Sequence, residues 1–156
     1  MRTTTKVLAM GGAVLAAVTV TGPARAGGVP EADLAFHGSA VMEGDRVEVQ
    51  LTPSNHGPSA VPEADVRLRW SVPLADRQIL PVGCVRTGER EVVCGTGPLP
   101  ADGPGQRIDL GLMLRDRPQE VRLEIATVWS GGMVDRDRTN DQVRVLVLDT
   151  GDAYSF

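Results

Sequence analysis

The sequence RVEVQL at residues 46–51 alternates apolar and polar side chains without a break. Successive side chains of an extended chain point to opposite faces, so Val47, Val49 and Leu51 fall on one face and the polar residues on the other. An antiparallel sheet with one face on a core and the other in solvent carries this alternation. Residues 46–51 therefore predict a half-buried β-strand.

The same alternation recurs along the chain, at residues 66–72 (VRLRWSV), 107–114 (RIDLGLML), 121–129 (VRLEIATVW) and 142–148 (QVRVLVL). Residues 32–36 (ADLAF) predict a weaker first strand, and turns rich in glycine and proline separate the strands. About seven or eight short strands at this spacing, without a helical pattern, predict an Ig-like antiparallel β-sandwich.

The first residues have the composition of a secretory signal peptide. A basic start precedes an uncharged apolar run at residues 7–20, and Ala24-Arg25-Ala26 supplies a cleavage site. The run is too short to span a membrane as a helix. We therefore expect an exported monomer without a membrane span in its mature part. The expected boundaries are a signal peptide at 1–26, a linker at 27–32, the sandwich at 33–149 and a tail at 150–156.

Charge narrows the classes of partner. After residue 26 the chain has 13 arginines, no lysine and 20 acidic side chains, a net charge of −7. Such a domain is a poor candidate for nucleic acid or for anionic lipid. Arginines on the polar faces of the predicted strands are expected to pair with carboxylates across the sheet. These arginines include Arg67, Arg69, Arg115 and Arg122.

The chain has two cysteines, Cys84 and Cys94. An exported protein meets an oxidising compartment, so a disulfide is expected. A three-residue turn at 88–90 would set the cysteines opposite each other in a hairpin, with Val85 and Val93 on the other face. The disulfide would then join neighbouring strands. Two thiols and two histidines are too few ligands to favour zinc.

Residues 55–59 (NHGPS) interrupt two of the alternating runs. Asn55 can bond backbone groups two residues on, Gly57 can take a positive φ, and Pro58 has a fixed φ and no N–H. Ser59 can also bond locally. Each residue type suits a structural turn, and none of them requires chemistry.

These features recur in a pattern that resembles a known family. The matching residues are Asn55, Gly57, Pro58 and Ser59; Pro81, Gly83 and Cys84; Cys94, Gly97 and Leu99; and Asp135, Asn140 and Asp141. Their order and spacing over residues 33–148 are similar to the bacterial "conserved repeat" family, the eleventh of the numbered domains of unknown function. The chain departs from that pattern at Pro62, Gly95, Pro98 and Pro100. The resemblance implies an Ig-like structural or adhesive module of exported and surface proteins, without catalytic residues.

Candidate chemistry is sparse. His56 could be combined with Ser59 and Asp65 as a triad, but no nucleophile elbow is present, so we expect no catalytic residue. His37, beside a predicted turn at Gly38 and Ser39, is treated in the same way as His56. Of the tryptophans, Trp70 shares an apolar strand face and is expected in the core, and Trp129 ends a strand and is expected to be partly exposed.

One segment carries the oxygen atoms that a cation prefers. Asp135, Asp137, Asn140 and Asp141 are candidate Ca²⁺ ligands within residues 135–141 (DRDRTND). The segment lacks the glycine and the distal glutamate of an EF-hand loop, and Arg136 and Arg138 would repel a cation. A solvated turn is therefore the favoured interpretation, and no cofactor is expected.

The favoured function is a secreted, non-enzymatic Ig-like module for adhesion or interaction, whose partner is an extracellular protein or a cell-envelope component. The alternative is a small exported hydrolase inhibitor, or a hydrolase, that uses a rigid loop near residues 95–104. Thr96 to Pro100 (TGPLP), beside Cys94, is the segment best suited to inhibition. The irregular stretch at 95–106 is predicted to be a surface crossover held by Leu99.

Overall fold

The computed structural model describes residues 28–156, and the predicted signal peptide at 1–26 lies outside the described residues. The regular structure of the described part consists of strands: β1 (Glu31–Ala32), β2 (Leu34–Glu43), β3 (Arg46–Asn55), β4 (Asp65–Trp70), β5 (Cys84–Gly88), β6 (Glu91–Gly95), β7 (Gly103–Pro104), β8 (Ile108–Met113), β9 (Glu120–Trp129), β10 (Val134–Asp135), β11 (Gln142–Leu148) and β12 (Ala153–Ser155).

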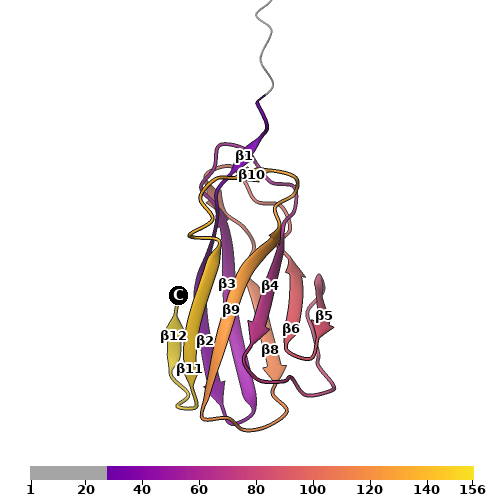
Figure 1. Ribbon diagram of the computed structural model, residues 1–156, viewed down its shortest axis with the longest axis vertical. Coiled ribbons are helices and arrows are strands. Elements are labelled where there is room, and N and C mark those ends of the chain that lie inside the picture. Colours follow the sequence, from indigo (N-terminus) through magenta and orange to yellow (C-terminus); the bar gives the residue numbers. More distant parts are fainter. Residues whose placement is uncertain (1–27) are drawn as a thin grey trace, which may run out of the picture.

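Two five-stranded sheets face each other (Figure 1). Sheet 1 has the order β12-β2-β3-β7, with β8 also paired to β3. Sheet 2 has the order β11-β9-β4-β6-β5. A short parallel pair, β1 with β10, closes the end of the sandwich at the top of Figure 1. The pairings within the two sheets are antiparallel.

The order of the strands is that of an immunoglobulin-type Greek key. The β2–β3 hairpin is extended by β8, while β4 pairs with β9 and β9 pairs with β11. The β5–β6 hairpin widens sheet 2 beside β4, where variable-type Ig domains also add strands. The predicted fold class, an all-β Ig-like sandwich with one intrachain disulfide, is confirmed, although the strands outnumber the seven or eight expected.

The core lies between the sheets and is built from the apolar faces that the alternation predicts. Val47, Val49 and Leu51 of β3 are at most 1% exposed, and Trp70 of β4 is 1% exposed. The other buried members of these faces are Val66, Leu68, Leu110, Leu112, Leu114, Val121, Leu123, Ile125 and Val147. Each large apolar side chain removed from water contributes about 1.5–3 kcal/mol before the cost in conformational entropy. This core is what fixes the two sheets face to face.

Strand β3 is longer than the alternation predicts, since it continues past Leu51 to Asn55. The additional residues include Pro53, which cannot donate a hydrogen bond. The carbonyl of Pro53 accepts from Gly105 N, so its missing N–H would face the same side. On that side β3 changes its partner from β8 to β7. The proline therefore falls where the ladder is already interrupted.

Both ends of the domain extend further than expected. The predicted linker at 27–32 contains β1, in which Glu31 pairs with Val134. The predicted tail at 150–156 contains β12, which pairs with β2 at the edge of sheet 1. Tyr154 and Phe156 pack against the core, and the Phe156 and Gly38 backbones exchange hydrogen bonds of 3.0 Å each. Residues 150–156 are therefore part of the sandwich.

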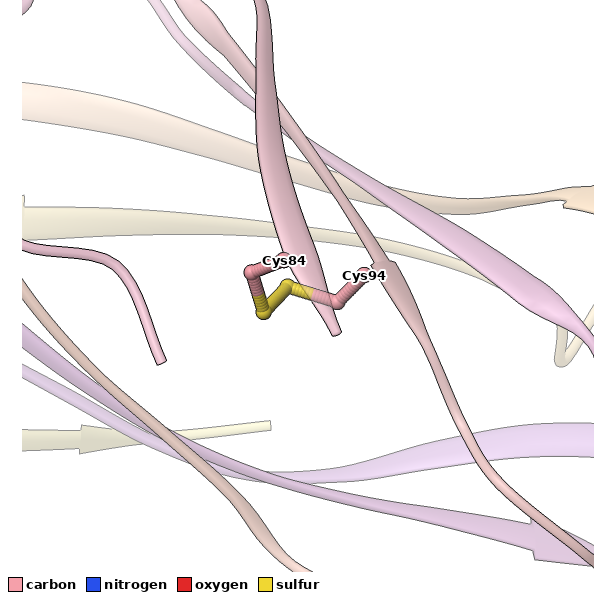
Figure 2. The surroundings of a disulfide bond; sticks show 2 residues. All are labelled: Cys84 and Cys94. Atoms are coloured by element: carbon pink, nitrogen blue, oxygen red, sulfur yellow. A yellow bond between two sulfur atoms is a disulfide. The ribbon is translucent and has the colours of Figure 1, made fainter. Parts of the chain in front are cut away.

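The disulfide hairpin has the pairing that the spacing predicts, with Cys84 opposite Cys94 and a bond between them (Figure 2). The turn differs from the prediction. Gly88 pairs with Glu91, so the turn residues are 89 and 90, and the register shifts between Arg86 and Gly88. Thr87 is thus left unpaired and forms a bulge in β5. The spacing of the cysteines alone does not predict this bulge.

Removing the disulfide should destabilise the domain without changing its fold. In the chain-entropy model, a crosslink over a separation of 10 residues contributes about 3 kcal/mol. We expect the Cys84→Ala/Cys94→Ala variant to lose about 2–3 kcal/mol of unfolding free energy in urea titrations, with its far-UV circular dichroism unchanged. Reduced wild-type protein should behave similarly. An equal stability of oxidised and reduced protein would contradict this prediction.

Candidate functional site

Asn55, at the end of β3, is fully buried and uses its whole side-chain amide. Its Oδ1 accepts hydrogen bonds from Asp33 N at 3.1 Å and from Gly57 N at 2.9 Å. Its Nδ2 donates to Ser59 O at 2.8 Å and to Pro100 O at 3.1 Å. The hydrogen-bonding capacity of this amide is therefore fully used. One side chain joins the turn at 55–59 to two segments that are remote in sequence.

Backbone contacts strengthen the same junction. His56 N donates to Asp33 O at 2.8 Å, and Ser59 N donates to Glu31 O at 3.1 Å. The turn therefore forms a ladder-like contact with residues 31–33, beside the pair of β1 and β10. This end of the sandwich has a continuous hydrogen-bond network in place of a free loop.

Gly57 has a role that differs from the predicted one. Its φ is not among the positive values in the structure. A Cβ at this position would lie 2.6 Å from the backbone of Ala32, too close for any side chain. The glycine is required because two backbones meet, not because the turn needs a left-handed residue.

The acidic segment at 135–141 also contacts the chain at residues 33 and 34. Asp135 Oδ2 accepts from Leu34 N at 3.0 Å, and Asn140 Nδ2 donates to Asp33 Oδ1 at 2.7 Å. Asp33 therefore contacts both the turn at 55–59 and the segment at 135–141. Two motifs about 80 residues apart in the sequence are joined through one short stretch of chain.

The four candidate calcium ligands do not form a site of metal ligands. Asp135 Oδ1 accepts from Asp137 N, and Asp137 Oδ1 accepts from Thr139 N, each at 3.1 Å. The hydrogen bonds from Thr139, that of its side chain first, lower the pKa of Asp137. Across residues 28–156, no three His, Cys, Asp or Glu side chains are grouped so that they could hold a metal ion. One carboxylate oxygen each of Asp135 and Asp137 accepts from the backbone of this segment, and the second oxygen of Asp135 accepts from Leu34 N.

Asp141 differs from its neighbours because it is completely buried. Its Oδ2 lies 3.2 Å from Arg138 Nη2, yet neither carboxylate oxygen has a hydrogen-bond partner. Burial raises the pKa of Asp141 above its ordinary value of 3.8, Arg138 opposes that shift, and Asp135 adds to it. A buried carboxylate is costly to ionise, and here Arg138 is the cation that opposes that cost.

The two histidines do not assemble a catalytic group. His56 is exposed, and in the described part of the chain no hydrogen bond joins its side chain to Ser59 or Asp65. His37 is exposed within β2, where Gly38 and Ser39 continue the strand and form no turn. The two imidazole rings stack with their centroids 6.4 Å apart.

The segment considered for inhibition is fastened to the sandwich. Leu99 is 1% exposed and exchanges backbone hydrogen bonds of 2.8 and 2.9 Å with Val61, which agrees with its predicted role as an anchor. Thr96 is buried, and its Oγ1 accepts from Ala64 N at 3.0 Å. Pro98 and Pro100 are the exposed side chains of this segment. Leu99 and Thr96 therefore hold this segment against the sandwich, with Pro98 and Pro100 exposed to solvent.

Three strongly exposed apolar side chains at residues 79–85 were not predicted from the sequence. Ile79 is 93% exposed, Val82 is fully exposed and Val85 is 59% exposed. We call these three residues the edge patch. They lie in and just after the irregular stretch between β4 and β5, at the free edge of sheet 2 (Figure 1). One sequence feature could have indicated this exposed group. Residues 79–82 (ILPV) are mostly apolar but do not alternate with polar residues as a half-buried strand does.

The chain matches no protein-family model, no curated protein and no solved structure. Within residues 28–156, none of the regular structure is a helix long and apolar enough to cross a bilayer.

Replacing Asn55 with alanine should destabilise the domain strongly. The change leaves the N–H groups of Asp33 and Gly57 and the carbonyls of Ser59 and Pro100 without their partner. At about 1 kcal/mol for each hydrogen bond, we expect Asn55→Ala to lose about 4 kcal/mol of unfolding free energy in urea titrations. The adjacent exposed residue supplies the control, since His56→Ala should change stability by less than about 0.5 kcal/mol. Similar losses in the two variants would refute the role given to Asn55.

Asp141 should make stability fall as the pH rises from about 4 toward neutral. Its pKa is higher in the folded than in the unfolded chain, so the folded state binds more protons between the two values. We expect the unfolding free energy of wild type, relative to Asp141→Asn, to decrease as the pH rises through that window. Chemical denaturation at several pH values measures this difference. A difference that is flat or increases with pH would show that the burial of Asp141 is compensated.

Proposed function

We propose that the protein is an exported, non-enzymatic interaction module that docks on a cell-envelope component through the free edge of sheet 2. The observation that carries this proposal is the edge patch. Three aliphatic side chains within seven residues face solvent, although each would gain from burial. Solitary exposed apolar residues are ordinary, but a concentrated group on a folded domain is typical of a binding surface.

The energy available at the patch is substantial. Burying one large aliphatic side chain contributes about 1.5–3 kcal/mol. Ile79 and Val82 are at least 93% exposed, so a partner could cover nearly their whole apolar surface. Binding energy usually concentrates in a few such side chains near the centre of an interface.

The scaffold beneath the patch is held in place. The Cys84–Cys94 disulfide joins β5 to β6 at the end of β5 that adjoins Val82 and Val85. The Arg86 side chain donates to Ala75 O at 2.7 Å and to Leu74 O at 3.3 Å, which fastens the preceding irregular stretch to β5. A preorganised surface loses less entropy on binding than a flexible one.

The edge of the sheet offers a second mode of contact. β5 is the last strand of sheet 2, and it pairs with β6 on its other side. An exposed edge can accept an additional strand from a partner. The resemblance to the "conserved repeat" family, with its exported and surface proteins, also supports an adhesive function over an enzymatic one.

Co-sedimentation with isolated envelope from the producing cells tests the proposal. We expect the oxidised protein to pellet with the envelope, and the Ile79→Ser/Val82→Ser variant to bind about tenfold more weakly. Because both side chains are exposed, the variant should unfold at the same urea concentration as wild type.

The matched control removes two exposed apolar side chains elsewhere. Met113 and Val134 are 38% and 40% exposed, on β8 and β10. Met113→Ser/Val134→Ser should pellet like wild type. If wild-type protein stays in the supernatant, or if both double variants lose binding equally, the proposed function is wrong.

A further inference from the structure

A hollow of about 280 Å³ lies on the outer face of sheet 2. Its lining includes Arg69 of β4, Arg90 of the hairpin turn and Arg122 of β9, all exposed, together with Ser71 and Glu124. Three arginines from separate segments therefore meet at one place on a domain whose overall charge is negative.

Two of these arginines, Arg69 and Arg122, depart from the pairing that the sequence predicts. Arg69 lies opposite both Glu91 and Glu124 in the register of sheet 2. Glu124, however, pairs with Arg144 at 3.4 Å. Glu91 contacts Arg67 at 4.0 Å and accepts a hydrogen bond from Thr87 Oγ1 at 2.8 Å. The neighbouring carboxylates are thus engaged with other side chains.

Within residues 28–156, Arg69, Arg90 and Arg122 take part in none of the ion pairs. The side chains of Arg69 and Arg122 also make no hydrogen bond in this part of the chain, while Arg90 Nη1 donates to Ser71 O at 3.1 Å. That bond holds one guanidinium beside the hollow and leaves its other N–H groups free. The hollow therefore presents unused donors that carry positive charge.

A second hollow, on the outer face of sheet 1, provides a comparison within the same molecule. Its volume is about 360 Å³, and its charged lining residues are Arg46, Glu48, Arg107 and Asp109. Both of its arginines are paired, Arg46 with Glu48 at 2.8 Å and Arg107 with Asp109 at 2.9 Å. The charges of that lining cancel. The first hollow, which we call the arginine hollow, has three arginines and one carboxylate in its lining.

The charge and donor pattern indicate an anionic ligand. Guanidinium groups bind carboxylate and phosphate oxygens through paired hydrogen bonds. The acidic residues elsewhere on the domain do not prevent this, because charges are screened over about 8 Å at physiological salt. A single anionic group on an exposed sheet face would bind weakly, but a polymer with repeated groups rebinds at high effective concentration.

We infer that the arginine hollow binds an acidic cell-envelope polymer through its carboxylate or phosphate groups. This inference deepens the proposed function, on which its biological setting rests, by naming the chemistry of the partner. One residue of the edge patch, Val85, lies on the same sheet. Val85 is opposite Val93, and Val93 is opposite Arg67, so these three side chains share the outer face with Arg69. The outer face of sheet 2 therefore carries Val85 of the edge patch as well as the arginines of the hollow.

Binding to purified polymers tests the inference without envelope. Polygalacturonate supplies carboxylates, polyphosphate supplies phosphates, and neutral dextran is the blank. We expect wild-type protein to bind at least one of the two acidic polymers, with an affinity that falls as salt is added. The polymer that binds more tightly identifies the preferred anionic group. Binding to neither, or equal binding to dextran, would overturn the inference.

The decisive comparison uses two variants of equal charge. Arg69→Gln/Arg122→Gln removes side chains that make no native hydrogen bond, so folding should be retained. Arg46→Gln/Arg107→Gln removes the same charge from the hollow on sheet 1, where both arginines are in ion pairs. We expect the first variant to bind the acidic polymer about tenfold more weakly, and the second to stay within about twofold of wild type. If both variants bind the polymer equally more weakly than wild type, the loss follows from net charge alone and the arginine site is refuted.

The two proposals fail in different ways. If the protein binds purified acidic polymer but does not pellet with envelope, the proposed function is wrong, and the hollow stands as an anion-binding site whose partner is not an envelope polymer. If it pellets with envelope through the edge patch while Arg69→Gln/Arg122→Gln binds like wild type, the arginine site is refuted and the proposed function stands.

Discussion

The structure depends on the buried amide of Asn55. A buried polar side chain is costly unless each of its donors and acceptors finds a partner, and here the partners belong to three separate stretches of chain. The turn, the entry to β2 and the crossover before β8 consequently have one relative arrangement. Asp33, one of those partners, carries the constraint on to Asn140 and the acidic segment. The end of the sandwich is thus organised by amide and carboxylate groups, while its middle is organised by apolar packing.

The alternation of apolar residues predicted most of the fold because burial acts on every second residue of a strand. It identified the faces of β3, β4, β8 and β9 directly. It did not predict β12, since a three-residue strand carries too little pattern and forms because the edge of β2 is available for pairing. Nor did it predict that β3 continues to Asn55. A proline is tolerated in a strand only where no N–H is needed, and at Pro53 this depends on where the neighbouring strand β8 begins.

The candidate sites show the same limit. Residue types revealed that Asn55, Gly57 and Asp135 suit turns. The partners of Asn55 and Asp135 outside their own turns lie 22 to 101 residues away in sequence, and these contacts follow from the tertiary fold. The arginine hollow was also out of reach. Alternation places Arg69 on the outer face, yet Glu124 pairs with Arg144 rather than with Arg69, and that choice depends on side-chain placement across three strands. Sequence gives the composition of a surface more readily than its local charge.

The disulfide hairpin has a consequence for the outcome of proteolytic cleavage. Glu89 and Arg90 form an exposed turn between the two cysteines, and such tips are where nicking enzymes act first. A cut there would leave the two pieces joined through Cys84 and Cys94, and each piece would keep its strand in sheet 2. A nicked molecule would therefore remain a single covalent unit, and its damage would become visible only after reduction.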